Sequence, residues 1–374
     1  MTIQEITDRE QWNTFLISQP HGHLLQSYEW GELHQYLGGR IYRLGALEDG
    51  RLTGAMMLTV NAVALPAMLP GLHFDWLYSR RGPIVERPDA AALTALIEHA
   101  HTIARKERAV VLRLEPNIAD DEPYMEKWLT AYARLDFRTN PAAMHARRSW
   151  VLNIRPSAEQ LLANFKMTWR QNVRSAERKG VVIREATSEA DFDTYYELLK
   201  ITSERDDFFI HSKEYHREIL RHFRPEGNAV LYLAEHEGEA IAAKMLIRFG
   251  DWCWDMFGAS SNSKRNLKPT YLLQYRCILW AKERGCSYLD FRAIPEILEP
   301  GEEMWGVYEY KKGFGGFSRL NMPTQDYVYR PLIYNAWRKV AEIRRIRRHE
   351  ERKKVELERA ARSKMDNKLS PLTR

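Results

Sequence analysis

The sequence predicts an α/β protein in which two domains of similar design, each a mixed sheet flanked by helices, precede a basic C-terminal helix. The same order of hairpin, strand, helix and strand occurs twice, and 374 residues are enough to form two cores. In addition, positive charge is concentrated near the C-terminus. We place the first domain at residues 1–155, the second at 156–335 and the basic helix or tail at 336–374.

The first half of the chain reads as two short helices followed by a hairpin, a strand, a helix and a strand. These elements are expected at residues 8–18, 27–37, 40–47 with 51–60, 77–85, 90–107 and 109–114. The hairpin is the strongest of these predictions, because two apolar runs flank the turn sequence Glu48-Asp-Gly50. Glu115 and Pro116 then close the last strand, which has the continuous apolar character of a buried one.

The second half repeats this order. Its hairpin, strand, helix and strand are expected at residues 230–235 with 240–248, 251–258, 270–284 and 287–291. A tandem duplication of one α/β domain explains the repeat better than coincidence does. The shared order of elements resembles the core of the GNAT N-acyltransferase fold, so the sequence predicts two GNAT-like domains in tandem.

Composition and termini indicate a folded cytoplasmic protein. Hydrophobic residues make up 44% of the chain, and its three cysteines form neither a disulfide framework nor a metal-binding spacing. The N-terminus lacks the basic and apolar regions of a signal peptide. The longest apolar region, residues 55–72, is interrupted by Pro66 and Pro70, which makes it a poor transmembrane candidate.

The net charge of +6 belongs to the tail rather than to the body. Residues 338–374 carry roughly 14 Lys and Arg against 6 Asp and Glu, about +8 in total. A helix is expected from about Pro331, and beyond Arg347 charge dominates, so that part should be solvated or frayed. Such a tail suits RNA or the anionic inner face of a membrane, and a purely solubilising role is the alternative.

A basic helix is expected between the two repeats, at residues 157–180. Apolar residues recur at helical spacing along it, and four cations spaced four residues apart form one stripe. These cations are Lys166, Arg170, Arg174 and Arg178. A solvated helix face and a polyanion-binding surface explain the stripe equally well.

The stretch Val307–Phe317 combines an aromatic, strand-like run with two lysines and a glycine-rich segment. Glycines let the backbone bend and let another molecule approach, and cations beside such a turn suit an anion or a developing oxyanion. The alternative is a strand that ends in a turn with two solvated lysines.

Several chemistries lack the residues that they need. A coenzyme A site requires a glycine-rich loop at a helix start, but residues 264–270 contain no glycine and include a proline. The corresponding first-domain segment, 85–89, is no better suited. His21 and His23 have no partners at metal-binding spacing, so we expect no metal and no cofactor.

A series of segments in order from Leu25 to Phe317 resembles the Fem-type aminoacyltransferases, which build peptidoglycan cross-bridges. The segments are Leu25–Trp30, Arg81–Ile84, Leu112–Pro116, Arg170–Gly180, Glu204–Tyr215, Phe257–Ser260 and Tyr310–Gly315. The family fold is two tandem acyltransferase domains, in agreement with the internal repeat.

The resemblance implies that an amino acid arrives as an ester on tRNA and leaves as an amide on the stem peptide of a lipid-linked or nucleotide-linked muropeptide. This reaction is aminolysis of an activated ester, for which positioning and charge stabilisation suffice. Two alternatives remain. One is an acyltransferase that uses another donor on a cell-envelope polysaccharide, and the other is a non-enzymatic adaptor that binds RNA or membrane.

The resemblance also implies roles for individual residues. Lys311 matches the family's functional lysine, expected to hold the tRNA 3′ end and to stabilise negative charge, with Lys312 as its comparator. Glu115 matches an acidic position near the acceptor, where it would orient or deprotonate the amine unless it forms a structural salt bridge. Candidate substrate contacts are Trp30, His34, Arg81, His211, Tyr215, Phe257 and Tyr310, and the basic stripe is the candidate tRNA contact.

The chain departs from the family pattern at several positions. Arg292 and Ala293 stand where many members have two glycines, and Asn321 follows the glycine-rich turn where glycine is common. His34 and His211 stand where one relative has a lysine and an arginine. These changes bear on the identity of the acceptor and its phosphate contacts more than on the reaction class.

Overall fold

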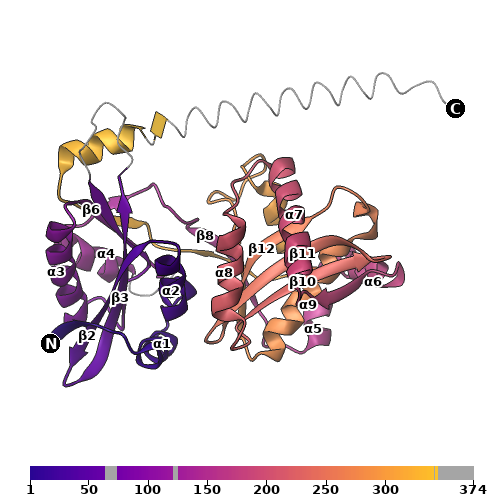
Figure 1. The fold of residues 1–374 in the computed structure, drawn as a ribbon, viewed down its shortest axis with the longest axis horizontal. Coiled ribbons are helices and arrows are strands. Elements are labelled where there is room, and N and C mark those ends of the chain that lie inside the picture. Colours follow the sequence, from indigo (N-terminus) through magenta and orange to yellow (C-terminus); the bar gives the residue numbers. More distant parts are fainter. Residues whose placement is uncertain (64–73, 121–124, 341, 344–374) are drawn as a thin grey trace.

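The computed structural model describes residues 1–63, 74–120, 125–340 and 342–343. These residues form two mixed sheets, each flanked by helices, and we call each sheet with its helices a lobe (Figure 1). The predicted fold class, two tandem α/β units with mixed sheets, is therefore confirmed.

The first sheet has the strand order β1-β2-β3-β4-β6-β15-β7, with β5 paired to β3. Its strands are β1 (Thr2–Glu5), β2 (Arg40–Glu48), β3 (Arg51–Ala62), β4 (Asp75–Arg81), β5 (Ile84–Val85), β6 (Ala109–Pro116), β7 (Arg138–Asn140) and β15 (Thr324–Val328). The β2–β3 hairpin turns at the predicted position, and Asp49 and Gly50 have the positive φ angles that such a turn requires. β4 and β6 are parallel, and the other pairs are antiparallel.

The helices described in the first lobe are α1 (Arg9–Ser18), η1 (Leu24–Gln26), α2 (Tyr28–Tyr36), α3 (Ala91–Lys106) and α4 (Met125–Arg134). Helices α1 and α2 each begin at a side-chain cap. The Asp8 side chain accepts a hydrogen bond from the Gln11 amide at the start of α1, and Ser27 does the same for Trp30 in α2. The cap predicted at Ser27 is thus confirmed.

The second sheet has the strand order β14-β8-β13-β12-β11-β10-β9. Its strands are β8 (Arg148–Asn153), β9 (Val182–Glu185), β10 (Ala229–His236), β11 (Glu239–Phe249), β12 (Trp252–Ser260), β13 (Tyr288–Ala293) and β14 (Phe317–Leu320). β12 and β13 are parallel, as β4 and β6 are in the first sheet, so the predicted repeat exists in three dimensions.

Two predictions about the helices of the second lobe are wrong. Its helices are α5 (Ala158–Asn164), α6 (Met167–Arg178), α7 (Glu189–Asp206), α8 (Lys213–Phe223), η2 (Arg265–Leu267), α9 (Pro269–Glu283) and α10 (Trp305–Lys312). The helix expected at 157–180 is split in two, because Phe165 and Lys166 have extended backbones. The strand-like run after Val307 is helix α10, whose Tyr308 is buried against the sheet.

The chain crosses between the two sheets twice. β8 belongs to the second sheet, so the first lobe ends before Arg148, and the boundary predicted after residue 155 is too late in the chain. β15 returns to the first sheet, within the range 156–335 assigned to the second domain. The chain therefore joins the two lobes at two places, and after the second crossing β15 pairs with β6 and β7 of the first sheet.

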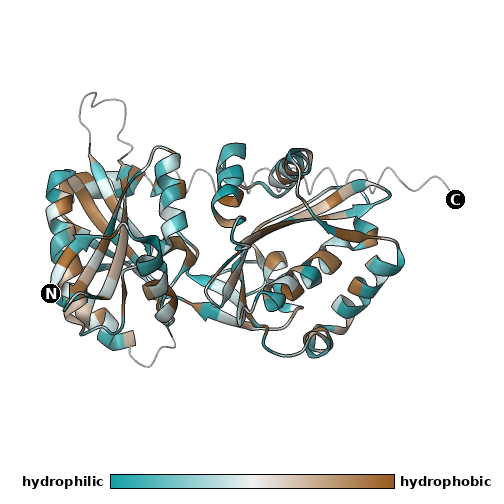
Figure 2. Ribbon diagram, turned by 60° about the horizontal axis from the view of Figure 1, so that its bottom comes forward, coloured by the Kyte–Doolittle hydropathy of each residue, from teal (hydrophilic) through white to brown (hydrophobic). Residues whose placement is uncertain are grey.

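A shared hydrophobic core also joins the lobes. Side chains from α1 and α2 pack in one cluster with side chains from α7, α8 and the hairpin β10–β11. Trp30 of α2 lies 6.3 Å from Phe223 of α8, measured between ring centroids, and both rings are buried. Figure 2 shows apolar residues concentrated in the strands of both sheets, while the helices carry both kinds.

The C-terminal helix begins at Pro331, as predicted, and packs first on the body of the protein. Trp337 lies against Trp76 of β4 at 5.5 Å, and the Tyr334 hydroxyl donates to the carboxylate of Asp326 at 2.6 Å. The rest of the predicted basic tail, residues 344–374, lies outside the described residues. Within the described part of the chain, no helix has the length and apolar character needed to cross a membrane.

Candidate active site

The parallel strands β12 and β13 separate along their length. They pair at Trp252–Tyr288, Cys253–Leu289 and Trp254–Asp290, and pairing ends there although both strands continue. In the first sheet, by contrast, the equivalent strands β4 and β6 stay paired to their ends at Arg81 and Pro116. The second sheet therefore has an opening between two strands, and the first sheet does not have one at the corresponding place.

Charged side chains line this opening. Lys244 of β11 forms an ion pair with Asp255 of β12, and both side chains are nearly inaccessible to solvent. On the other strand, one carboxylate oxygen of Asp290 accepts a hydrogen bond from the Arg292 amide at 2.6 Å. Burial raises the pKa of Asp290, and the nearby cations only partly oppose this effect. The opening is thus a polar site surrounded by apolar core.

Lys311 reaches the opening from the last turn of α10. Its ammonium group donates to the backbone carbonyl of Ala293, at the end of β13, over 2.7 Å. Burial lowers the pKa of Lys311 to about 8, although the Asp255 carboxylate opposes the shift. Lys312, the comparator, is more than half exposed and lies over the Tyr308 ring. The two adjacent lysines therefore have different environments, and Lys311 is the one directed into the site.

A glycine contact between α6 and α10 fixes the position of Lys311. The Trp169 indole of α6 donates to the Tyr310 carbonyl at 2.9 Å, and the Lys166 amide donates to the Gly313 carbonyl at 2.8 Å. A Cβ atom at Gly313 would lie only 2.3 Å from the indole ring. Gly316 has a φ of +103°, and a Cβ there would meet the Val151 carbonyl oxygen at 2.3 Å. The glycine-rich run thus permits close packing of α10.

Tyr310 serves mainly as a link between helices. Its hydroxyl donates to the carbonyl of Thr270, in the first turn of α9, at 2.9 Å. Its ring packs edge-on against Tyr271 and Phe314 at 5.4 and 5.1 Å. We therefore expect Tyr310 to orient Lys311, its neighbour in the chain, through this packing.

Glu115 does not have the environment of a general base. Its carboxylate accepts hydrogen bonds from the Tyr78 hydroxyl at 2.5 Å, the Met144 amide at 2.5 Å and the Thr324 hydroxyl at 3.2 Å. The ring of His145 is also within 3.2 Å. Burial alone would raise the pKa of this carboxyl group, but these hydrogen bonds outweigh burial and hold the pKa below its usual value. The geometry favours the structural alternative, in which Glu115 orients Tyr78 and His145.

Two arginines at the end of β4 face the space between the lobes. Arg81 donates to the Ala146 carbonyl at 2.8 Å, and Arg80 donates to the Thr59 hydroxyl at 3.1 Å while lying over the Tyr78 ring. Within the described residues, neither arginine forms an ion pair. The predicted contact Arg81 therefore retains donors for an anion.

Three predicted substrate contacts of the second lobe come together, namely His211, Tyr215 and Phe257. His211 and Tyr215 stack with ring centroids 4.0 Å apart, and His216 links Tyr215 to Phe257 at 4.3 Å from the latter. His216 was not predicted, because no pattern marks a buried histidine on an apolar helix face. Its Nδ1 contacts the Tyr195 hydroxyl at 2.9 Å, and its buried Nε2 has no hydrogen-bond partner among the described residues.

The predicted contacts of the first lobe divide into two groups. His34 lies on α2 near Arg80 and His211, and burial first and Arg80 next lower its pKa to about 3. Trp30 does not line the site: it is 4% exposed and packs against Phe223 in the core between the lobes. The sequence could not separate the two, since both residues lie on one short aromatic helix.

The basic stripe is only partly intact. Lys166, Arg174 and Arg178 are exposed at or along α6. Arg170 instead folds back to donate to the carbonyls of Ala163 and Phe165, where α5 ends. Its cation therefore caps a helix, which the spacing alone could not reveal because the break at Phe165 was not foreseen.

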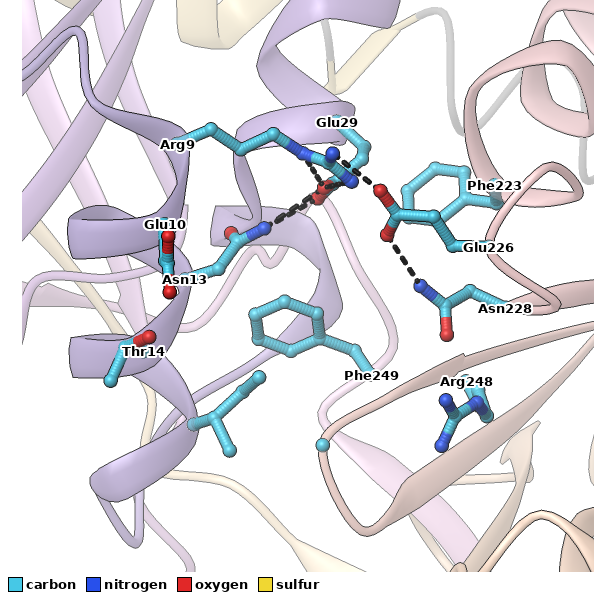
Figure 3. Close-up of a pocket in the computed structure, with 12 residues that line it drawn as sticks. Arg9, Glu10, Asn13, Thr14, Glu29, Phe223, Glu226, Asn228, Arg248 and Phe249 are labelled. Carbon is cyan, nitrogen blue, oxygen red and sulfur yellow. Dashed lines mark hydrogen bonds and ion pairs between the residues drawn. The ribbon is translucent and has the colours of Figure 1, made fainter.

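A separate cavity of about 520 Å³ lies between the lobes, away from the strand opening (Figure 3). Arg9 of α1 crosses it and forms ion pairs of 2.5 Å with Glu29 of α2 and with Glu226 of the second lobe. None of the predicted site residues lines this cavity. Its main contacts join the two lobes.

Comparisons with known proteins agree with this geometry. The family model described as "FemAB family" matches residues 7–127, and the model described as "Acetyltransferase (GNAT) domain" matches residues 163–312. A lipid II:glycine glycyltransferase from Staphylococcus aureus is 23% identical, with 89% of this chain and 94% of the relative covered.

Among solved structures, the crystal structure of FemX superimposes with a TM-score of 0.80 at 22% identity, covering 90% of this chain and 99% of that one. A tandem GNAT protein from the clavulanic acid biosynthesis pathway gives 0.53 at 12% identity, with 87% and 98% covered. The fold and the strand opening thus define a tandem GNAT-type acyltransferase. Within that class, the chain is similar to the FemAB family over residues 7–127 and to a lipid II:glycine glycyltransferase over most of its length.

Proposed function

We propose that the protein transfers an amino acid from aminoacyl-tRNA to the stem peptide of a lipid-linked or nucleotide-linked muropeptide, as a step in peptidoglycan bridge formation. The main observation is that Lys311 is held at the opening between β12 and β13, with its pKa lowered to about 8 by burial. The similarity to proteins named lipid II:glycine glycyltransferase extends over 89% of the chain and supports the same activity.

The proposed reaction requires little from the protein beyond positioning and charge. The acceptor amine attacks the ester carbonyl, the carbonyl oxygen becomes negatively charged, and the ribose oxygen departs when the tetrahedral intermediate collapses. The ammonium of Lys311 stabilises that negative charge and holds the tRNA 3′ end, while the attacking amine loses a proton and the ribose oxygen gains one. No covalent bond to the enzyme is needed.

The exposed cations of α6 would contact the tRNA backbone. Lys166 and Trp169 link α6 directly to α10, so a phosphate chain following Arg174 and Arg178 lies on the helix that positions Lys311. Phosphate contacts of this kind position a nucleic acid without reading its sequence. The stripe therefore supports a tRNA donor through its location as well as its charge.

The start of α9 favours this donor over coenzyme A. Pro269, which lacks an amide hydrogen, is the first residue of the helix, and Lys268 before it is in the left-handed conformation. A pyrophosphate would need successive amide groups directed toward it at this place. An acyltransferase with a different donor for a cell-envelope polysaccharide remains the second candidate, because the acceptor site does not depend on the donor.

A reconstituted reaction distinguishes the two candidates. Purified protein is mixed with charged tRNA and muropeptide, and the product is followed by mass spectrometry. We expect transfer that ribonuclease abolishes and that acyl-coenzyme A cannot replace. Transfer that acyl-coenzyme A alone supports would establish the second candidate. Binding of tRNA and membranes without any transfer would favour the adaptor.

We also propose that the C-terminal segment holds the enzyme at the inner face of the membrane. Trp337 and Tyr334 anchor its helix, whereas Leu332 is 87% exposed. Each basic residue near an anionic surface contributes about 1 kcal/mol, so several give reversible attachment. Truncation after Arg348 should abolish binding to anionic liposomes and preserve affinity for tRNA. Loss of tRNA affinity alone would assign the tail to RNA instead.

A further inference from the structure

Arg292 occupies an unusual position at the strand opening. Its φ angle is +66°, in the left-handed region that side chains other than glycine rarely adopt. It follows Asp290 and Phe291 on β13 and precedes Ala293, whose carbonyl receives the hydrogen bond of Lys311. A strained residue that is one position from a proposed reaction centre is a candidate for a functional role.

The guanidinium group of Arg292 lies against a weak hydrogen-bond acceptor. Its Nη1 donates to the thioether sulfur of Met256 at 3.0 Å, and sulfur is a weak acceptor. Within the described residues, no carboxylate lies at ion-pair distance from it, and the nearby carboxylate of Asp255 pairs with Lys244 instead. The side chain is partly accessible to solvent. A partly buried arginine normally binds a carboxylate or a phosphate, and here its donors remain available.

Arg292 lies between the proposed reaction centre and the proposed acceptor contacts. Its side chain contacts Met256, the neighbour of Phe257 in the chain, and the next residue, Ala293, accepts the hydrogen bond of Lys311. Burial lowers the pKa values of Lys311 and His211 and raises that of Tyr215, and the Arg292 charge adds to the first two shifts and opposes the third. Arg81 of the first lobe is also close enough to act on Arg292, and Asp290 offsets part of the positive charge. An anion in this space would be bound from both lobes.

We propose that Arg292 binds a carboxylate of the substrate that lies next to the reacting amine or acyl group. The inference rests on the proposed function and specifies its substrate. A carboxylate fits better than a phosphate because the site is within one residue of the Lys311 contact, where the reacting amino acids meet. The planar guanidinium presents parallel donors that match a carboxylate.

Two substrates would supply such a carboxylate. One is an acceptor amine whose own carbon bears a carboxylate, as in diaminopimelate, in contrast to the plain side-chain amine of lysine. The other is an acidic amino acid carried by the tRNA, in contrast to glycine, alanine or serine. In either case the residue selects the substrate by its charge.

The test compares matched variants on matched substrates. Arg292→Gln removes the charge and keeps a polar side chain and the backbone strain, and Arg292→Gly removes the charge and relieves the strain. Each variant is assayed with muropeptides containing diaminopimelate or lysine, and with tRNA charged with aspartate or glycine. Thermal unfolding checks that each variant is folded. If the glutamine variant does not fold, the substrate comparison is made with the glycine variant alone.

We expect kcat/KM for the carboxylate-bearing substrate to fall about 10- to 100-fold in both variants, as loss of a charged hydrogen-bonded pair predicts. The matched neutral substrate should change less than about 3-fold. Selective loss with diaminopimelate assigns the carboxylate to the acceptor, and selective loss with aspartate assigns it to the donor. Equal losses on all substrates, or no loss, would overturn the proposal.

A failure of the proposed function gives a different result. Wild-type protein that transfers nothing from any charged tRNA refutes the aminoacyltransferase proposal. Equilibrium binding of the two muropeptides to wild-type protein and to Arg292→Gln then decides the fate of the carboxylate site. Tighter binding of the diaminopimelate form that disappears in the variant supports that site, and equal affinities for both forms refute it.

Discussion

Replacing Gly313 with alanine should displace the helix that carries Lys311. The added Cβ would lie 2.3 Å from the Trp169 ring, closer than real Cβ contacts allow, although the φ of −64° at this position suits alanine. The cost is therefore steric. Overpacking of this kind costs about 1–3 kcal/mol, and loss of the indole hydrogen bond to Tyr310 adds about 1 kcal/mol.

Gly306 in the same helix provides the control. A Cβ there would meet nothing within 4 Å, and alanine in a helix is favoured over glycine by roughly 0.5–1 kcal/mol. Urea denaturation should therefore show Gly313→Ala destabilised by about 2–4 kcal/mol and Gly306→Ala slightly stabilised. Transfer activity should fall only in the first variant. Equal stability of the two variants would refute the packing argument.

Three further predictions concern protonation and charge. The transfer rate should rise with pH as the acceptor amine loses its proton, and it should stop rising above about pH 8, where Lys311 loses its positive charge. Lys311→Arg stays charged, so this break should be absent from its pH–rate profile. Glu115 has a lowered pKa, so its stabilising effect is present above roughly pH 4.5 and is lost as the pH falls through the folded-state value. Acid unfolding curves of the wild type and Glu115→Gln should therefore converge at low pH, and parallel curves would show that the carboxylate is not involved. Neutralising Arg174 and Arg178 together should reduce the slope of log tRNA affinity against log salt concentration by about 2. An unchanged slope would indicate that these cations form a solvated face.

Most of the fold could be predicted because local patterns determine it. The hairpin at Glu48-Asp-Gly50 and the parallel strands of each lobe have strong signals in turn chemistry and apolar runs. The return of β15 to the first sheet could not be predicted, because β15 pairs with β6, which lies more than 200 residues earlier in the sequence. The aromatic run of α10 was misread as a strand, since Tyr308 and Tyr310 have high strand propensity and tertiary packing overrides it.

The site shows the same division. The position of Lys311 could be inferred from the resemblance, and the structure places it at the strand opening. His145 and His216 could not be found, because their roles depend on Glu115 and Tyr195, which are distant in the sequence or on another helix. Arg292 departs from the family pattern, but only the structure shows that its guanidinium group contacts a thioether and has no anionic partner among the described residues.

The most direct test of the account is the rate of amino acid transfer by Lys311→Ala and Lys312→Ala in the reconstituted reaction. The two lysines are adjacent and chemically identical, but only the first reaches the opening between β12 and β13. Loss of a preorganised charge at the reaction centre costs on the order of 3 kcal/mol, or roughly 100-fold in rate. The account predicts such a loss for Lys311→Ala, with less than about 3-fold for Lys312→Ala and unchanged thermal stability in the latter. Equal, small losses in both variants would contradict it.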